Sequence, residues 1–485
     1  MLRPYRFRRP CGSPTRSPPH SFPRTQDDGE GGGVTHYRYP DSHVFYRKLG
    51  RSYPRIVRGE GCWLYDEQGK GYLDAVGGAY VANLGHSNPE IAEALAGQAR
   101  EFGYVSGTAF THGPVEELAR ELAATLPGEL DKLYFLSSGS EAVEAALKLA
   151  RQYWIEAGKP GKHRIIALNP SYHGNTLLAL SASAREQYKF PFREWLVDVE
   201  RIPAPYPYRC GCRGDDATCP ACSGAALEDA IERAGADTVA AFIAEPVGGS
   251  STGASTPRAE YFRTIREICD RHDVLFVADE ILCGAGRTGS WWAIEPYGVA
   301  PDLMTLGKGI SGGYAALSAV AAAERIVDVI ANGSGSLLHG QTFSFHPVAC
   351  AAGLAAVRVL KRDRLVERCA KVGRVLQRRL ATLAELPHVG DVRGRGLLAG
   401  IEFVEDKATR APFPRAAKFV EAFTEAAQGA GLVVWPNVGH ADGVNGDLVV
   451  VAPPFIITEP EIEELVTRFT SAHAAALKAV KAGVR

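Results

Sequence analysis

A strong charge of either sign and a long apolar run are both absent from this chain of 485 residues. The 54 basic and 55 acidic side chains leave a formal net charge of −1, so the molecule as a whole has no electrostatic attraction for nucleic acid. No apolar run approaches the roughly 20 residues that a transmembrane helix needs. We therefore expect a cytoplasmic globular protein that binds neither nucleic acid nor a membrane.

Methionine is scarce, and acidic residues are missing from the start of the chain. Only Met1 and Met304 occur, and no acid precedes Asp27, whereas arginine and proline are frequent there. The prolines would break the amphipathic helix of a transit peptide, and the apolar core of a secretory signal is lacking. We therefore expect residues 1–40 to be a disordered arm. A sharper hypothesis is that translation begins at Val34, which follows three glycines, and that the preceding residues are not made.

The ten cysteines are scattered except for one cluster. Cys210 and Cys212 form its first pair, and Cys219 and Cys222 form its second. Four thiols in a short polar loop match a structural zinc site in ligand number and type. One residue separates the cysteines of the first pair, however, instead of the two in the usual C-x-x-C. We see no sign of secretion, so reduced thiols are favoured over disulfides. The loop either binds zinc or is an uncoordinated loop that carries cysteines, and the second outcome is the more common one.

Short apolar runs alternate with helical segments from about residue 130 onward. The expected strands cover residues 132–136, 164–168, 239–244 and 274–278. Helical patterns cover residues 141–154 and 259–272 between them. This alternation predicts an α/β domain with a mainly parallel sheet.

The chain is expected to form a large and a small domain. Residues 96–345 would form the large α/β domain. Residues 346–485 change to helices at each end with strands over 391–403 and 448–457, which predicts a smaller α+β domain. Residues 41–95, with a hairpin near their centre, are expected to pack with this smaller domain.

Polar clusters follow the predicted strands at their carboxyl ends, where open α/β sheets bind ligands. The segment Ser138-Gly139-Ser140 joins a strand to a helix, and its free N–H groups at the positive end of the helix dipole suit a phosphate. No Walker lysine follows, which argues against a nucleoside triphosphate. An ordinary serine N-cap is the alternative.

Lys308 and Asp279 indicate what the phosphate-bearing ligand is. Lys308 lies in a mostly apolar stretch, where burial would lower the pKa of its amine and leave the nucleophile that a Schiff base needs. Asp279 ends an apolar strand, and a buried carboxylate there needs a partner such as a protonated pyridine nitrogen. The separation of the two residues is about one crossover unit, which brings both to the same edge of the sheet. A loop lysine that extends to water and a helix N-cap aspartate are the alternatives.

Two further strand ends complete the predicted site. Tyr172, followed by His173 and Gly174, offers an aromatic face on which a flat ring can stack, although a half-buried loop tyrosine explains it equally well. Glu245 places an acid at another strand end.

Seven segments of the chain resemble one known family in both content and order. They are Ser137-Ser138-Gly139-Ser140-Glu141-Ala142, Tyr172-His173-Gly174, Glu245-Pro246, Asp279-Glu280-Ile281, Gly286-Arg287-Thr288-Gly289, Thr305-Leu306-Gly307-Lys308-Gly309 and His339-Gly340-Gln341-Thr342. Over about residues 40 to 480, the chain resembles the class III, pyridoxal-phosphate-dependent aminotransferases of fold type I.

The resemblance implies a role for each cofactor-binding residue. Lys308 would hold pyridoxal 5′-phosphate as a Schiff base, and Asp279 would keep the pyridine nitrogen protonated. Gly139 and Ser140 would bind the phosphate.

Other residues would surround the ring and the substrate. Tyr172 would stack on one face of the ring, with His173 in the same cofactor-binding set, and Ile281 would press on the other face. Glu245 would support Asp279 and the ring substituents.

The resemblance also implies a second subunit. Thr342 would reach the phosphate of the neighbouring subunit's cofactor, which makes the active unit a homodimer, either alone or within a tetramer. Tyr80 would line the substrate pocket.

The implied reaction moves an amino group from a primary amine or an ω-amino acid to a keto acid by a ping-pong mechanism. The alternative is a pyridoxal-phosphate-dependent aminomutase or a decarboxylating relative of the same fold. Four positions depart from relatives that use amino acids with a distal amine: Asn175, Ser250, Leu282 and Val450. Because a bidentate carboxylate clamp is lost, these departures argue against a strict ornithine or 4-aminobutyrate enzyme.

Overall fold

The computed structural model describes residues 37–212 and 218–483. The chain divides into two units, of which the first ends at Arg55 and the second is Ile56–Arg485. In the first unit, the rings of Tyr46 and Tyr53 stack with their centroids 4.5 Å apart. The arm expected over residues 1–40 lies almost wholly outside the described residues, as does the hypothesis about the start at position 34.

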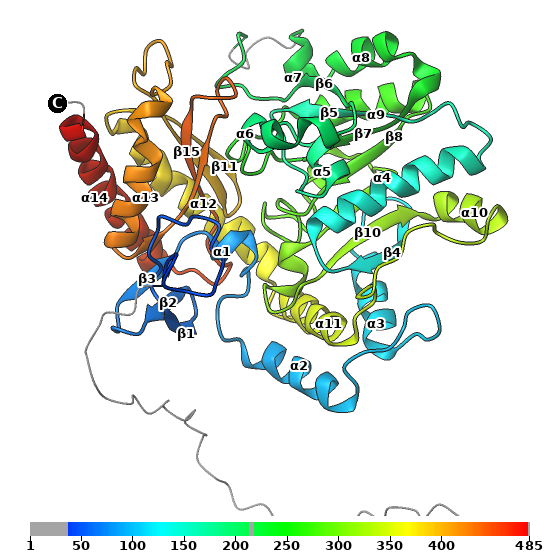
Figure 1. Ribbon diagram of the computed structural model, residues 1–485, viewed down its shortest axis with the longest axis horizontal. Helices are drawn as coiled ribbons and strands as arrows, with labels where there is room; N and C mark the ends of the chain where they lie inside the picture. The colour runs from blue at the N-terminus through cyan, green and yellow to red at the C-terminus, as the bar shows by residue number, and fades with distance from the viewer. Residues whose placement is uncertain (1–36, 213–217, 484–485) are drawn as a thin grey trace, which may run out of the picture. The chain divides into compact units, whose positions relative to one another are not determined.

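The largest sheet of the second unit has seven strands (Figure 1). In spatial order they are β4 (Leu130–Leu136), β10 (Ser318–Ala323), β9 (Leu303–Leu306), β8 (Leu275–Asp279), β7 (Val239–Ala244), β5 (Arg164–Asn169) and β6 (Glu200–Pro203). The strands from β9 to β6 are parallel, and β10 is antiparallel to both of its neighbours. Every residue of β7 is buried, as expected for a parallel strand with both faces covered. The predicted α/β class with a mainly parallel sheet is confirmed.

Helices cover both faces of this sheet. One face packs against α3 (Gly113–Ala123), α8 (Ala226–Ala234), α9 (Tyr261–Arg271) and α11 (Pro347–Arg362). The other face packs against α4 (Gly139–Glu156), α5 (Leu177–Ala182) and α10 (Glu324–Asn332). The loops that follow the parallel strands are therefore left to form a site at the carboxyl edge.

Two four-stranded sheets complete the second unit. The first pairs β1 (Ile56–Glu60), β2 (Trp63–Asp66), β3 (Gly71–Asp74) and β13 (Leu432–Val433). The second pairs β11 (Val389–Arg395), β12 (Leu398–Phe403), β15 (Asp447–Val451) and β14 (Trp435–Val438). Because β3 is parallel to β13, a segment near the start of the unit pairs with one near its end. The bounds of the large and small domains stay a prediction.

Seven further α-helices complete the described part of the second unit. They are α1 (Gly77–Tyr80), α2 (Pro89–Glu101), α6 (Glu186–Lys189), α7 (Pro220–Ser223), α12 (Leu365–Ala381), α13 (Phe419–Gly429) and α14 (Glu459–Gly483). Apolar residues of α12, α13 and α14 form one core with strands β12 and β15. Among the helices of the described residues, none is both long enough and apolar enough to cross a membrane.

The strands expected near the end of the chain differ from those observed. The run 391–403 forms two antiparallel strands, because Gly396 turns the chain at a φ of +59° and brings Arg395 opposite Leu398. The run 448–457 ends as a strand at Val451, before two prolines that have no N–H group to donate.

Candidate active site

A cavity of about 140 Å³ lies at the carboxyl ends of β5, β7, β8 and β9. The predicted site residues that line it are Gly139, Ser140, Tyr172, His173, Glu245, Asp279, Ile281 and Lys308. Sequence segments that are far apart thus meet at one edge of the sheet, as their position after consecutive parallel strands predicts.

Asp279 is the last residue of β8, and polar groups hold its carboxylate from several sides. The nearest is the His173 Nδ1 atom, 2.7 Å from Oδ2. The Thr305 hydroxyl and the backbone N–H of Ile281 each donate to Oδ1 at 3.1 Å. Asp279 is only 4% exposed, so these partners offset the cost of burying its charge. They also fix the direction in which the carboxylate faces.

His173 belongs to the β5–α5 loop and connects that loop to Asp279. Its backbone N–H donates to the Ser183 hydroxyl at 2.8 Å, and its ring is buried. The Nε2 atom has no hydrogen-bond partner among the described residues. The ring therefore orients Asp279 through one nitrogen and leaves the other available within a buried site.

Lys308 follows β9 and begins a short 3₁₀ turn, Lys308–Ser311. Its backbone has a φ of +45°, in the left-handed region that a residue with a side chain rarely adopts. Burial lowers the pKa of the Lys308 amine, and the charges of Asp279 and Glu245 oppose that shift. A strained backbone and an amine with a depressed pKa are both typical of functional sites.

Glu245 follows β7 and holds two loops at the cavity wall. Its Oε2 atom accepts the backbone N–H of Tyr172 at 3.2 Å, and Oε1 accepts the N–H of Gly249 at 2.9 Å. Burial raises the pKa of Glu245, and the neighbouring His173 opposes the rise. Glu245 thus positions the loop that carries Tyr172.

The N-terminus of α4 forms a cradle for an anion. Ser138 caps the helix, and its N–H donates to Glu141 at 2.8 Å. Gly139 and Ser140, the first two residues of α4, line the cavity, and N–H groups in the first turn of a helix have no partner within the helix. A Cβ atom added at Gly174 would meet the Ser140 hydroxyl oxygen at 2.6 Å. The close approach of these two loops therefore requires glycine at position 174.

Two predicted residues lie outside the cavity lining. Tyr80 is buried, and its ring packs against Trp435 with the centroids 5.6 Å apart. Thr342 is exposed, and its carbonyl accepts the Tyr104 hydroxyl at 2.9 Å. Because neither residue lines the cavity, the structure of one chain does not test the roles predicted for Tyr80 and Thr342.

Three residues near the site make contacts that sequence reasoning did not predict. Thr305 donates to Asp279, and Asn175 donates through its side chain to the Tyr172 hydroxyl at 2.8 Å. Arg185 lies with its guanidinium 6.0 Å from the Tyr172 ring centroid and 4.5 Å from that of Tyr188. Thr305 is the one polar residue of the buried strand β9, which is the signal that points to it, whereas Arg185 has no comparable signal.

Comparison with known proteins identifies the family. The family model for aminotransferase class-III matches residues 47–473. An uncharacterized aminotransferase of Schizosaccharomyces pombe is 40% identical over 428 residues, covering 88% of this chain and 93% of the relative. The putrescine–pyruvate aminotransferase of Pseudomonas aeruginosa is 35% identical, covering 87% and 91%.

A solved structure shares the fold as well. The ω-transaminase of Pseudomonas jessenii in complex with PMP has a TM-score of 0.81 and 32% identity, covering 89% of this chain and 94% of that one. The resemblance inferred from the sequence motifs is confirmed. The chain belongs to the class III aminotransferases, enzymes that transfer amino groups with pyridoxal 5′-phosphate as cofactor.

Proposed function

We propose that this chain is one subunit of a homodimeric transaminase that moves an amino group from a primary amine or an ω-amino acid to a keto acid. The proposal rests on the cavity where Lys308, Asp279 and the N-terminus of α4 converge. Two relatives support the choice of donor, since one is named for putrescine and pyruvate and the other is an ω-transaminase.

Pyridoxal 5′-phosphate fits the groups that line the cavity. Gly139 and Ser140 would hold its phosphate at the start of α4, Lys308 would hold its aldehyde, and the Asp279 carboxylate would face its pyridine nitrogen. Tyr172 would contact the ring. When bound, the cofactor withdraws electrons from the substrate carbon that carries the amine.

Lys308 would move the proton in this reaction. Burial lowers the pKa of its amine, which favours the neutral form of Nζ that can accept a proton from the substrate carbon. The same Nζ would then donate this proton to the cofactor carbon that took up the amine, rather than back to the substrate carbon. Asp279 would stay fixed during both transfers because His173 and Thr305 hold its carboxylate.

Arg185 is our candidate for binding the carboxylate of the acceptor. It is 8% exposed, and within the described residues no acidic side chain forms an ion pair with it. Tyr80 lies close to its charge and has a buried hydroxyl with no hydrogen-bond partner among the described residues. Arg185 Nη2 already donates to Asn437, so a keto-acid carboxylate would pair with its remaining N–H donors and with the Tyr80 hydroxyl.

Separate half-reactions test the role of Arg185. Arg185→Gln is expected to slow the half-reaction with a keto acid about 10- to 100-fold, the effect of losing a charged hydrogen bond of about 1.5–3 kcal/mol. The half-reaction with an amine that has no carboxylate should keep its rate. Arg185→Lys should restore only part of the loss, because lysine lacks the planar fork. An equal loss in both half-reactions would show that Arg185 supports the fold instead.

An exposed apolar surface around Thr342 supports the proposal that a second subunit binds there. Phe110 and Phe343 are 68% and 55% exposed, and the Phe343 ring lies 6.2 Å from that of Tyr104. Leu338, in the same loop as Thr342, is 69% exposed. Grouped apolar side chains of this kind mark interaction surfaces, and a second copy seated there would bring Thr342 to the partner's site.

Lys308→Ala tests the reacting centre. Borohydride reduction of the wild type with bound cofactor should add one cofactor mass to the peptide that contains Lys308, and the variant should show no adduct and no turnover. An adduct on another lysine, or turnover at the wild-type rate, would contradict the assignment.

The reaction type needs a different measurement. With an amine donor and no acceptor, each active site should consume one equivalent of amine and convert the cofactor to its amine form. Release of carbon dioxide, or of an isomer of the donor, would favour the aminomutase or decarboxylase alternative.

A further inference from the structure

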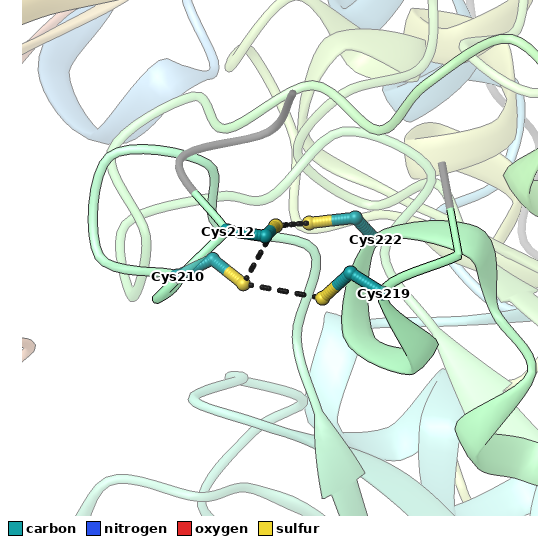
Figure 2. Close-up of side chains that lie close together, drawn as sticks. All are labelled: Cys210, Cys212, Cys219 and Cys222. Atoms are coloured by element: carbon teal, nitrogen blue, oxygen red, sulfur yellow. Dashed lines mark hydrogen bonds between the residues drawn. The ribbon is translucent and has the colours of Figure 1, made fainter. Parts of the chain in front are cut away.

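Four cysteine side chains converge on one point, in a loop that contributes nothing to the cavity that contains Lys308. The Sγ atoms of Cys210, Cys212, Cys219 and Cys222 all lie within 4.8 Å of one another (Figure 2). Cys210 is 3.2 Å from Cys212 and 3.5 Å from Cys219, and Cys212 is 3.4 Å from Cys222.

The four thiols come from two short segments. Cys210 and Cys212 follow β6, and the backbone N–H of Cys210 donates to the Tyr206 carbonyl at 2.7 Å. Cys219 precedes α7 and Cys222 lies within it, and the Cys222 N–H donates to the Cys219 carbonyl at 3.0 Å. Each segment is thus a turn that presents two sulfur atoms to the other.

Disulfide bonds do not explain this arrangement. A disulfide joins two sulfur atoms at about 2.05 Å, whereas the shortest separation here is 3.2 Å. The sulfurs also do not divide into two pairs, because Cys210 is close to a thiol of its own segment and to one of the other segment.

Packing of apolar thiols does not explain it either. The other cysteines of the described residues are buried one by one in the core: Cys62, Cys269, Cys283, Cys350 and Cys369. In the cluster only Cys222 is buried, and the remaining three are partly exposed. Thiols that gather at a surface loop rather than in the core indicate a ligand between them.

We propose that these four thiolates bind one structural zinc ion. Zinc bonds sulfur at about 2.3 Å in a tetrahedron, which places neighbouring sulfurs roughly 3.8 Å apart. The observed separations, from 3.2 Å to at most 4.8 Å, include that value. Four protein ligands leave no open position for substrate or water, so the ion has a structural role.

The ion would fasten one loop to two parts of the fold. The segment before Cys210 is already bound to β12, since the Tyr206 hydroxyl and Arg209 Nε donate to Glu402 at 2.5 Å and 2.6 Å. The segment with Cys219 and Cys222 continues into α7, which packs against α8 and α9 on the large sheet. Zinc would therefore connect strand β12 to the helices that cover the large sheet.

Metal analysis of the purified holoenzyme tests the proposal directly. We expect about one zinc per chain, retained through gel filtration, and four thiols that react with a thiol reagent only after zinc is displaced. Replacement of zinc by cobalt should give the intense visible bands of a tetrahedral thiolate site. A chain without metal that takes up no cobalt would overturn the proposal, as would iron in place of zinc or disulfides among the four cysteines.

Cysteine variants provide a second test. Cys212→Ser and Cys219→Ser should each lose the bound zinc and unfold several degrees below the wild type. The matched control is Cys350→Ser, which removes a cysteine of α11 and should retain one zinc per chain. If the two variants do not fold, release of zinc from the wild type by a mercurial reagent, at one ion per four titrated thiols, gives the same answer. Variants that keep their zinc would refute the site.

Discussion

Lys308 and Gly174 are the two positions at the active site where the backbone takes a positive φ, +45° and +140°. Glycine adopts such an angle freely, whereas lysine does so at a cost of about 1–3 kcal/mol. The surrounding β9 and the 3₁₀ turn that follows Lys308 hold this residue in place. At the residue scale, the backbone of the site is therefore constrained at a small number of positions. The sequence motifs already identify these positions.

Gly174→Ala is expected to weaken cofactor binding about tenfold or more, because the added Cβ would displace the Ser140 hydroxyl and strain the backbone. A titration with pyridoxal 5′-phosphate, followed by its absorbance, measures the change. Gly97→Ala is the matched control, since nothing lies within 4 Å of a Cβ there. It lies inside α2 and should leave cofactor affinity unchanged and stabilise the fold by about 1 kcal/mol. Equal affinities for the two variants would contradict the proposed phosphate cradle.

Some residues of the site could be predicted from the sequence and some could not. Lys308, Asp279 and Tyr172 stand in short motifs next to strand ends, so their meeting in one cavity follows from the βα alternation. Arg185 lies between short helices in a loop, and its approach to Tyr172 and Tyr188 depends on how that loop folds back. The spacing of apolar residues along the sequence carries no information about a contact of this kind.

Elements buried on both faces were the easiest to predict. Strands β7 and β8 are continuous apolar runs, because helices cover both of their faces. Helix α12 is absent from the sequence prediction, although its buried residues Leu365, Cys369, Val372, Leu376 and Leu380 recur at helical spacing. The turn at Gly396 was missed because the run 391–403 contains three glycines, and a glycine in a strand pattern does not by itself separate a bulge from a hairpin.

Glu280 links β8 to the loop that follows it, and its carboxylate accepts the N–H groups of Ala293 and Ile294 at 2.9 Å and 2.8 Å. Burial raises its pKa from 4.5 to about 7, and these two hydrogen bonds oppose the rise. The folded chain therefore holds this proton more tightly than the unfolded chain does. The resulting stability is fully present below pH 4.5 and is lost as the pH rises through about 7.

As the pH rises from 4.5 to about 7, we expect the unfolding free energy of the wild type to fall by up to about 3 kcal/mol because Glu280 ionises. Glu280→Gln cannot ionise, so its unfolding free energy should fall less between pH 5 and pH 8. Urea unfolding at a series of pH values compares the two slopes. Glu93→Gln, at an exposed glutamate of α2, serves as the control and should follow the wild type. A Glu280→Gln slope equal to that of the wild type would exclude this carboxyl as the source.

At the scale of the whole molecule, the exposed apolar side chains of Tyr104, Phe110, Leu338 and Phe343 mark the surface where we propose that a second copy binds. Phe343→Glu is expected to shift the protein from dimer to monomer, because a charge would be buried between the subunits. Sedimentation velocity measures the shift. Cofactor affinity should fall with it if Thr342 acts on the partner's phosphate.

Val444→Glu is the control for this experiment, since Val444 is 62% exposed in the loop between β14 and β15. It should remain a dimer. A Phe343→Glu variant that stays dimeric, or a wild type that is monomeric at working concentrations, would contradict the proposed interface.

The sequence by itself determined the family and the mainly parallel sheet, and it predicted that Lys308 and Asp279 meet at one edge of that sheet. These follow from apolar runs and from motifs that stand next to strand ends, which are local properties of the chain. The tertiary structure decided that Thr305 and His173 hold Asp279, that Arg185 approaches Tyr172, and that four thiols from two segments lie within 4.8 Å of one another. The physical reason is that each of these contacts joins segments brought together only by packing and loop closure, which leave no periodic pattern in the sequence.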